Sequence, residues 1–318
     1  MSELKSIPLV SMGFLTYNHF THLDPSIFIN AIESLIHQNY SNKEILIFDD
    51  CSTDGTYEMC QQYANKYSFI KLHRNSKNLG SVGNLEQLLS NIKSDFFFWP
   101  CPDDRYDPNY ISMCVEKFNK NNNAIVVLTG VKVTYDNGDI RHFKYIDFDM
   151  RFPLWKHVRN VLQNRDHFGN HILYPPAIHS AMVKSKYIYK LYCRDQFFGL
   201  EEAWFLNGLI WGEVDYIDQC LYFRKDISVP YSDKNPEIHY KFSRRNIYLI
   251  SSYKYLKHFI IDSQIDYSSK LKYFHMALLF FLYRALPYLI ANLKTELFLC
   301  LNKIGMLQYQ KKSIKIKY

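Results

Sequence analysis

The chain has 318 residues, of which 47% are hydrophobic and 22% charged, so it can form one large folded domain or two smaller ones. Only 11 residues are glycine, a composition that argues against a glycine-rich nucleotide-loop protein. The seven cysteines are scattered and contain no Cys-x-x-Cys pair. This pattern argues against a disulfide framework or a zinc site and favours a reducing, cytoplasmic setting.

The net charge of +7 is unevenly distributed along the chain. From Lys241 onward, 14 Lys and Arg residues face three acidic residues, so this part carries +11 and leaves −4 for the first 240 residues. We therefore expect the acidic part and the basic part to have different roles.

Apolar runs of strand length alternate with helical patterns through the first half of the chain. We predict strands at "PLVSMGFL", "KEILIF", "FIKLHR", "DFFFWP" and "AIVVLTGVKV". We predict one helix opened by Asp24-Pro25, one from Thr56 to Tyr67, one that follows "NLGSVGN" and runs to about Asn91, and one capped at Asp107 with Pro108 in its first position. Continuous apolar strands separated by helices indicate an α/β fold with a mostly parallel sheet that is flanked by helices.

The second half of the chain is less regular. "YDNGDI" at 135–140 predicts a hairpin, because Asn137-Gly138 suits a tight turn. A helix is expected from Glu201 to Trp211, followed by two short strands, "VDYI" and "CLYF". No element is predicted for 141–200, and the pattern from about Phe242 to the end is helical, aromatic and basic.

Polar residues follow several of the predicted parallel strands. In such sheets, ligands bind beyond the carboxyl ends of the strands. The first strand leads to Thr16, Tyr17 and Asn18, the second to Asp49 and Asp50, and the fourth to Asp103 and Asp104. Either acidic pair alone is explained by a helix cap or a solvated turn. Two pairs at one edge favour a hard cation, Mn²⁺ or Mg²⁺, shared with a ligand that carries phosphates.

These pieces together resemble glycosyltransferase family 2, which has the GT-A fold. The resemblance rests on "TYN", "DDCSTDGT", "NLGSVGN", "PDD" and "GLEEAWFLNGLIWGEVDYIDQCLYFRK", in the family's order over roughly residues 8 to 225. It implies a metal-dependent, inverting transfer of a sugar from a nucleotide diphosphate, with uridine diphosphate (UDP) favoured. It also implies a hydroxyl of a glycan or a lipid-linked molecule as the acceptor, in the synthesis of a surface polysaccharide.

The resemblance also implies roles for individual residues. Tyr17 would stack on the base, and Asp103 and Asp104 would hold the metal and touch the ribose, with the division between the two left open. Glu202, beside Glu201, would be the base that takes the acceptor proton. The remaining nucleotide contacts would come from Thr16, Asn18, Asp49, Asp50, Asn78, Gly80 and Asn84.

Two residues depart from the family pattern. Cys101 stands where the fuller Asp-x-Asp-Asp motif has its leading Asp, and we interpret it as a small buried filler rather than a ligand. Glu202 stands where family members commonly have Asp. A first-turn glutamate favoured by the helix dipole is the alternative interpretation of Glu202. His179, His239 and Arg224 are further candidates for phosphate or acceptor contacts, each also explained as a packed or solvated residue.

We predict two domains, a glycosyltransferase domain at 1–230 and a helical, basic extension at 231–318. The first would contain a nucleotide-sugar half at about 1–105 and an acceptor half at about 106–230. In the extension, residues 274–301 are strongly apolar, but the uncharged stretch before Arg284 is too short to span a membrane. We expect this segment either to dock peripherally on an anionic membrane, aided by "KKSIKIKY", or to pack on protein, including a second copy in a homodimer.

Other function classes fit the sequence less well. A nucleotidyltransferase would have a glycine-rich, basic loop after the first strand, where this chain has "TYNHFTHLDPS". A Rossmann oxidoreductase would have G-x-G-x-x-G, which does not occur. No nucleic-acid partner is expected. The remaining alternative is a protein of the same fold that binds a nucleotide sugar or a partner without turnover.

Overall fold

The computed structural model describes residues 6–135, 138–143, 179, 181–191, 211–226, 267–268 and 270–271. Contacts divide the chain into one unit of 1–194 and 201–236 and a second unit of 195–200 and 237–318. All strands and helices named below belong to the first unit. The predicted division into domains stays a prediction, and the apolar segment at 274–301 lies outside the described residues.

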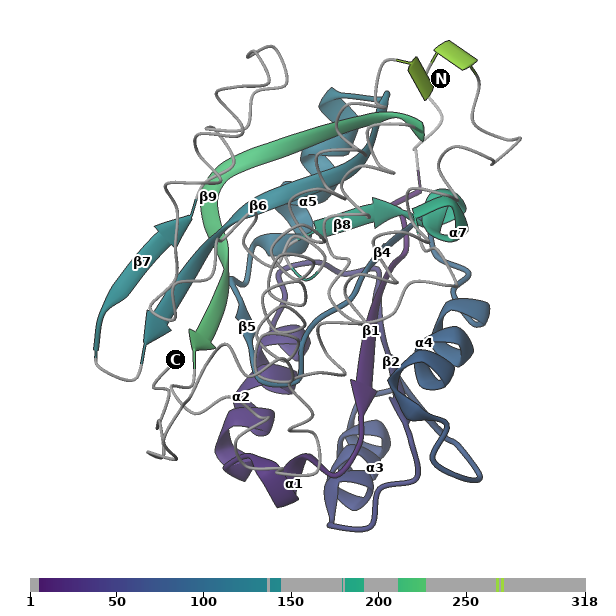
Figure 1. Cartoon of the computed structure of the whole chain (residues 1–318), viewed down its shortest axis with the longest axis vertical. Helices are drawn as coiled ribbons and strands as arrows, with labels where there is room; N and C mark the ends of the chain where they lie inside the picture. The colour runs from purple at the N-terminus through teal and green to yellow at the C-terminus, as the bar shows by residue number, and fades with distance from the viewer. Residues whose placement is uncertain are drawn as a thin grey trace, which may run out of the picture. The chain divides into compact units, whose positions relative to one another are not determined.

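The described residues form a nine-stranded mixed sheet whose N-terminal half is parallel (Figure 1). β1 (Val10–Thr16) pairs in parallel with β2 (Lys43–Asp49) and with β4 (Phe96–Phe98), and β2 pairs in parallel with β3 (Ile70–Arg74). This half confirms the α/β fold and the predicted parallel strands. Their carboxyl ends therefore meet at one edge of the sheet.

The other half of the sheet contains antiparallel pairs. β8 (Ala181–Lys184) lies between β4 and β6 (Ala124–Tyr135) and is antiparallel to both, and β6 pairs in parallel with β9 (Glu213–Asp226). β5 (Arg105–Tyr106) pairs with the far side of β9, and β7 (Ile140–Phe143) pairs with β6 as the predicted hairpin. The sheet is mixed because β5, β7 and β8 run antiparallel to their neighbours, and the sequence did not predict β8.

Helices cover both faces of the sheet. The flanking helices are α1 (His19–His22), α2 (Pro25–Ile36), α3 (Thr56–Lys66), α4 (Gly80–Ser90), α5 (Tyr110–Lys120) and α7 (Ile188–Leu191), with a 3₁₀ turn at Ser185–Tyr187. Residues of α2, α3 and α5 share one hydrophobic cluster with Ile45 and Ile47 of β2. Residues of α4 and α7 share a second cluster with Leu46 and Phe48. Alternate residues of β2 thus face opposite layers, as expected for a strand buried on both sides.

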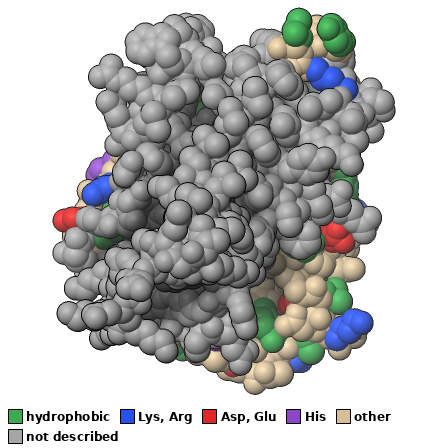
Figure 2. Space-filling view, viewed as in Figure 1, with side chains coloured by type: hydrophobic (Ala, Val, Ile, Leu, Met, Phe, Trp, Pro, Cys, Tyr) green, Lys and Arg blue, Asp and Glu red, His purple; other side chains and the backbone are tan. Residues whose placement is uncertain are grey.

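The outer surface of this helical covering is chemically mixed. On the lower right of Figure 2, hydrophobic, basic and acidic side chains of the described residues are interspersed, in the region of α3 and α4 in Figure 1. Among the described residues, none of the helices has both the length and the apolar character that a membrane crossing requires.

Gly13 allows α4 to pack closely on the sheet. A Cβ atom built on Gly13 would lie 2.5 Å from Cδ2 of Leu88 and 2.6 Å from Cε2 of Phe97. Such distances are far below van der Waals contact, so a larger residue would push the helix or the ring away. Glycine at the middle of β1 therefore sets the spacing between β1 and α4.

Two predicted elements differ in the structure. The strands expected at "VDYI" and "CLYF" are parts of one strand, β9, whose register with β6 shifts from Thr129↔Ile217 to Gly130↔Cys220. The two residues between the predicted strands form an irregularity of the bulge type, and a Cβ on Gly130 would lie 3.0 Å from the carbonyl oxygen of Gln219.

The helix expected to start at Pro108 begins at Tyr110 instead. The Asp107 carboxylate accepts from the Asn109 N–H at 2.9 Å, and its carbonyl accepts from the Tyr110 N–H at 3.0 Å. These two bonds span two and three residues, which is the spacing of a turn rather than of an α-helix, so a turn precedes the helix. The predicted helix over 201–211 lies outside the described residues except for Trp211.

Candidate active site

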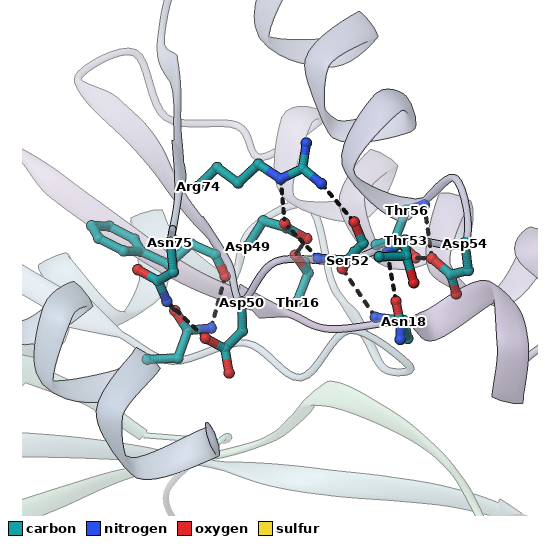
Figure 3. A network of polar contacts seen from close by, with 12 residues as sticks. Thr16, Asn18, Asp49, Asp50, Ser52, Thr53, Asp54, Thr56, Arg74 and Asn75 are labelled. Carbon is teal, nitrogen blue, oxygen red and sulfur yellow. Dashed lines mark hydrogen bonds and ion pairs between the residues drawn. The ribbon is translucent and has the colours of Figure 1, made fainter. Parts of the chain in front are cut away.

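The loops that follow β1 and β2 are joined at the sheet edge. Thr16, the last residue of β1, pairs with Asp49, the last residue of β2, and the Asp50 N–H donates to the Thr16 carbonyl at 2.9 Å. Figure 3 shows the polar network around these strand ends. The predicted nucleotide residues of both loops are therefore neighbours.

Asp49 organises the loop after β2 from a fully buried position. One carboxylate oxygen accepts from the Thr16 hydroxyl at 3.1 Å, and the other accepts from the Ser52 N–H at 2.9 Å. Arg74, at the end of β3, lies 3.6 Å from the second oxygen and donates to the Ser52 carbonyl at 2.7 Å (Figure 3). Both oxygens of Asp49 have protein partners in this arrangement, so a direct contact of Asp49 with a nucleotide stays a prediction.

Asp50 anchors the loop before α4. Its Oδ1 accepts from the Asn75 amide at 2.9 Å and from the Leu79 N–H at 2.8 Å. Asn75 also donates to Oδ1 of Asn84 at 2.9 Å, and Asn84 donates to the Phe48 carbonyl at 2.9 Å. Two of the predicted residues, Asp50 and Asn84, are therefore linked through Asn75, which the sequence did not single out.

Asn78 and Gly80 lie at the start of α4 and are exposed. The side-chain oxygen of Asn78 accepts from the Gly80 N–H at 2.8 Å. Gly80 has a φ of 74°, in the region that favours glycine, so this position bends the chain into the helix. Both residues border the loop that Asp50 anchors.

The turn after β1 presents Tyr17 and is fastened to the loop after β2. Tyr17 is 43% exposed, as a stacking platform requires. Asn18, in the left-handed region at φ 46°, donates through its N–H to the Ser52 hydroxyl at 3.0 Å, and its side chain accepts from the Thr53 N–H at 2.8 Å. These two contacts fix the backbone immediately after Tyr17.

Asp54 makes a second connection between the turn after β1 and the loop after β2. Its carboxylate accepts from the N–H and hydroxyl of Thr21 at 2.8 and 3.1 Å, and from the N–H and hydroxyl of Thr56 at 3.0 and 2.7 Å. The Thr56 hydroxyl in turn accepts from the His19 N–H at 3.0 Å. The run of Ser, Thr and Asp in "DDCSTDGT" is the sequence signal for such side-chain-to-backbone bonding, although it does not name the partners.

The loop after β4 forms a turn that brings three potential metal ligands together. Pro102 occupies the second position of a turn that closes through the Asp104 N–H and the Cys101 carbonyl at 3.3 Å. The Cys101 sulfur and one oxygen each from Asp103 and Asp104 lie within 4.8 Å of one another. In the part of the chain that the structure describes, this is the one cluster with metal-ligand spacing.

Two carboxylate oxygens in this cluster lack a partner. Oδ1 of Asp103 and Oδ1 of Asp104 are buried and have no hydrogen bond within the described part of the chain. The other oxygen of Asp104 accepts from the Tyr222 hydroxyl on β9. Buried acceptors without partners are costly and rare, so these two oxygens fit a group that the protein binds. Two carboxylates are donors that suit Mg²⁺ or Mn²⁺.

The charges in the cluster shift several pKa values. Burial, and then the charge of Asp103, raise the pKa of Asp104 to about 7, against the Tyr222 hydrogen bond and the charge of Arg224. Burial and the two carboxylates raise the pKa of the Cys101 thiol well above its usual range. Burial lowers the pKa of His19, while the charge of Asp103 opposes that shift. The charge of Asp103 thus reaches His19, which follows the turn after β1.

Other candidate residues have different surroundings. The His179 ring bonds the Trp99 carbonyl at 2.8 Å, and the His179 carbonyl accepts from the Tyr106 hydroxyl at 2.7 Å. These contacts give His179 a packed position next to the loop after β4. Glu201, Glu202 and His239 lie outside the described residues.

The fold and the acidic strand-end loops define the chain as a GT-A-type protein. The structure is similar to that of Staphylococcus aureus TarS 1–349, at 15% identity and a TM-score of 0.55, over 87% of this chain and 71% of that one. A TarS 1–349 structure in complex with UDP matches at a TM-score of 0.50 over 80% and 73% of the two chains. Residues 15–182 match the model of the family described as glycosyl transferase family 2, and the chain belongs to this family.

Relatives in other bacteria share parts of the sequence. The processive diacylglycerol beta-glycosyltransferase of Mycoplasma pneumoniae is 27% identical over 188 residues, which are 56% of this chain and 50% of that protein. The putative glycosyltransferase EpsE of Bacillus subtilis is 36% identical over 35% of this chain and 40% of its own. The cholesterol galactosyltransferase of Borreliella burgdorferi is 31% identical over 31% of this chain and 29% of its own. The matched segments thus span half or less of these relatives.

Proposed function

We propose that the protein is a metal-dependent, inverting glycosyltransferase. It would move the sugar of a UDP-sugar donor to a hydroxyl of a lipid-linked or glycan acceptor. The observation that carries the proposal is the pair of buried, unpartnered oxygens of Asp103 and Asp104. Both residues lie in the acidic loop after β4, at the sheet edge where the carboxyl ends of the parallel strands β1, β2 and β4 meet. Membership of glycosyl transferase family 2 supports sugar transfer as the reaction.

Uridine diphosphate is proposed as the nucleotide part of the donor. The exposed ring of Tyr17 offers a face for the base, and Asn18 and Asp54 hold the turn that carries it. Asp50 and Asn84, which Asn75 links by hydrogen bonds, are proposed to border the base on its other side. The TarS structures determined with UDP and with UDP-GlcNAc support this choice.

Mn²⁺ or Mg²⁺ is the proposed cofactor, and Asp103 and Asp104 would hold it. When bound, such an ion stabilises the charge that develops on the departing diphosphate. The Tyr222 hydroxyl orients the Asp104 carboxylate from one side, which leaves its Oδ1 available. Glu202, beside Glu201, is proposed as the base that takes the proton from the acceptor hydroxyl, because inversion by a single displacement needs one such base.

The test is calorimetric titration of the protein with UDP, in Mn²⁺ and in chelator. We expect tighter binding with Mn²⁺, and we expect Asp104→Ala to reduce the affinity in Mn²⁺ by at least about tenfold. Asp95→Ala is the matched control, because Asp95 is an exposed aspartate just before β4, at the opposite end of that strand. Equal UDP affinity of the wild type in Mn²⁺ and in chelator would contradict the proposed cofactor.

Turnover separates an enzyme from a binding protein of the same fold. We expect slow hydrolysis of a UDP-sugar in the presence of Mn²⁺ when no acceptor is added, because water can replace the acceptor hydroxyl. UDP binding without any hydrolysis across a panel of uridine, guanosine and thymidine diphosphate sugars would instead favour the non-catalytic alternative.

A lipid-linked acceptor is proposed on two grounds. Two of the relatives are named for diacylglycerol and cholesterol, which are lipids. The tail from Lys241 onward carries +11, and each basic residue near an anionic leaflet contributes about 1 kcal/mol. A peripheral position on the inner face of the membrane would bring the site to an intermediate of surface polysaccharide synthesis.

Co-sedimentation with liposomes tests this docking. The full chain is expected to sediment with anionic liposomes at low salt. A variant with the four lysines of "KKSIKIKY" changed to glutamate is expected to stay largely in the supernatant. If the wild type also stays there, the tail packs on protein instead, and light scattering would then reveal a homodimer.

A further inference from the structure

The thiol of Cys101 lies in the acidic cluster rather than in the hydrophobic core. Cys60 and Cys114 are fully buried members of the main hydrophobic cluster, which is the expected position of a filler cysteine. Cys101 is half-buried, does not belong to either hydrophobic cluster, and has its sulfur within 4.8 Å of oxygens of Asp103 and Asp104. The surroundings of Cys101 therefore differ from those of the two cysteines in the hydrophobic core.

We propose that Cys101 is a metal ligand in this cluster, so that the site binds Zn²⁺ or Co²⁺ through one sulfur and two carboxylate oxygens. This inference rests on the metal site of the proposed function and adds a preference for zinc or cobalt as the bound ion. Thiolate sulfur favours zinc and cobalt, whereas manganese and magnesium favour oxygen ligands alone. The thiolate should therefore make the preference for zinc over manganese larger than that of a site with oxygen ligands alone.

The observed geometry needs only a small adjustment for a shared ion. Zinc binds sulfur at about 2.3 Å and carboxylate oxygen at about 2.0 to 2.2 Å, so ligands in a tetrahedral site lie roughly 3.5 Å apart. The three atoms, now within 4.8 Å, can approach through side-chain rotation of Cys101 and Asp103, which are only partly buried. The fourth position would remain for water or a phosphate oxygen.

The unpartnered carboxylate oxygens are a second observation in favour of a bound ion, independent of the residue types in the cluster. Asp104 is 4% exposed, and its Oδ1 has no hydrogen bond within the described part of the chain. Tyr222 holds the other oxygen, so rotation of the carboxylate is restricted while Oδ1 keeps its free acceptor positions. As the metal–sulfur bond forms, the thiol proton passes to solvent, and the ion charge compensates the two carboxylates.

The experiment uses the full chain, freed of metal by chelation and titrated with Co²⁺. A cobalt–thiolate bond produces a charge-transfer absorption band in the near ultraviolet, which carboxylates do not produce. We expect this band to saturate at one ion per chain in the wild type and to be lost in Cys101→Ser. Cys51→Ser is the control, because Cys51 is another half-buried cysteine, in the loop after β2, and should keep the band.

Competition between metals gives the second measurement. Free Mn²⁺ is followed by electron paramagnetic resonance while Zn²⁺ is added. We expect Cys101→Ser to weaken zinc binding by at least about tenfold, the lower end of what losing a metal-site interaction costs. Manganese binding should change little. Cys101→Asp, which completes the three-carboxylate motif, should bind manganese at least as well as the wild type while lacking the cobalt band.

Zinc-edge X-ray absorption of the wild type should find one sulfur among the ligands, a result that does not depend on any variant. The inference is overturned if no sulfur is found, if Cys101→Ser keeps the band, or if Cys51→Ser loses it. Manganese-dependent UDP binding with no sulfur in the zinc site would overturn this inference alone. A cobalt–thiolate band without metal-dependent UDP binding would overturn only the proposed function.

Discussion

Removing Asp54 tests whether its carboxylate fastens the tyrosine-bearing turn to the rest of the site. The four hydrogen bonds of Asp54 join Thr21 and Thr56. We assign about 0.5 kcal/mol to each bond with the exposed Thr21 and about 1 kcal/mol to each with the buried Thr56. Asp54→Ala should therefore lower the free energy of unfolding by about 3 kcal/mol, and Asp54→Asn, which keeps one acceptor oxygen, by about half of that.

The pH dependence of this effect follows from the pKa of Asp54. Burial, the largest single influence, raises it, but the hydrogen bonds from Thr56 and Thr21 together outweigh burial and hold the pKa below its usual range. A carboxylate with a lowered folded-state pKa contributes its full stability above the unfolded value, about 3.9, and loses it as the pH falls further. The difference between wild type and Asp54→Asn should thus be constant from about pH 5 to 8 and shrink below about pH 4.

Urea unfolding followed by circular dichroism measures both quantities. Asp24→Ala is the control, because the Asp24 carboxylate caps α2 through the Ser26 N–H and its loss should cost only about 1 kcal/mol. The reasoning is refuted if Asp54→Ala costs no more than Asp24→Ala. It is also refuted if the difference between wild type and Asp54→Asn changes between pH 6 and 8, since another group would then be titrating.

Further substitutions test packing, donor binding and catalysis. Gly13→Ala should cost about 1 to 3 kcal/mol in urea unfolding, because its Cβ would lie 2.5 Å from Leu88; no loss would mean that α4 shifts freely. Tyr17→Ala should weaken UDP binding by about 1 to 3 kcal/mol in calorimetry while the phenylalanine variant does not, and equal losses in both would exclude stacking. Glu202→Gln should slow transfer at least about a hundredfold with unchanged UDP affinity, and Glu201→Gln should be milder; the opposite order would move the base by one residue.

The parallel half of the sheet could be predicted because its signals are local. β1 and β2 are continuous apolar runs, and Asp24 before Pro25 marks the start of α2 as the structure has it. The rule that parallel strands end at one edge then predicts that the residues after β1 and β2 lie together. Local patterning and one topological rule were sufficient for this part of the site.

The other half could not be predicted because its pairings are long-range. Nothing within "AMVK" indicates that β8 is inserted between β4 and β6, and the irregularity in β9 divides one strand into two apparent ones. The hydrogen bonds of Asp54 were also missed, because a turn-forming composition predicts bonding without naming the partner. The Tyr222 contact with Asp104 joins residues that have no pattern in common.

That Tyr222 contact has a consequence for how the protein matures. Asp104 and Tyr222 are 118 positions apart, and Tyr106 pairs with Tyr222 in the same ribbon. Contacts of such long sequence separation close large loops and form slowly. The strands β1 to β4 can assemble from the first hundred residues, but the Tyr222 partner of Asp104 must wait for β9. A nascent chain stalled before β9 would therefore have the loops after β1 and β2 in place while the acidic cluster still lacked its Tyr222 contact, and we expect the proposed nucleotide binding to precede the proposed metal binding during synthesis.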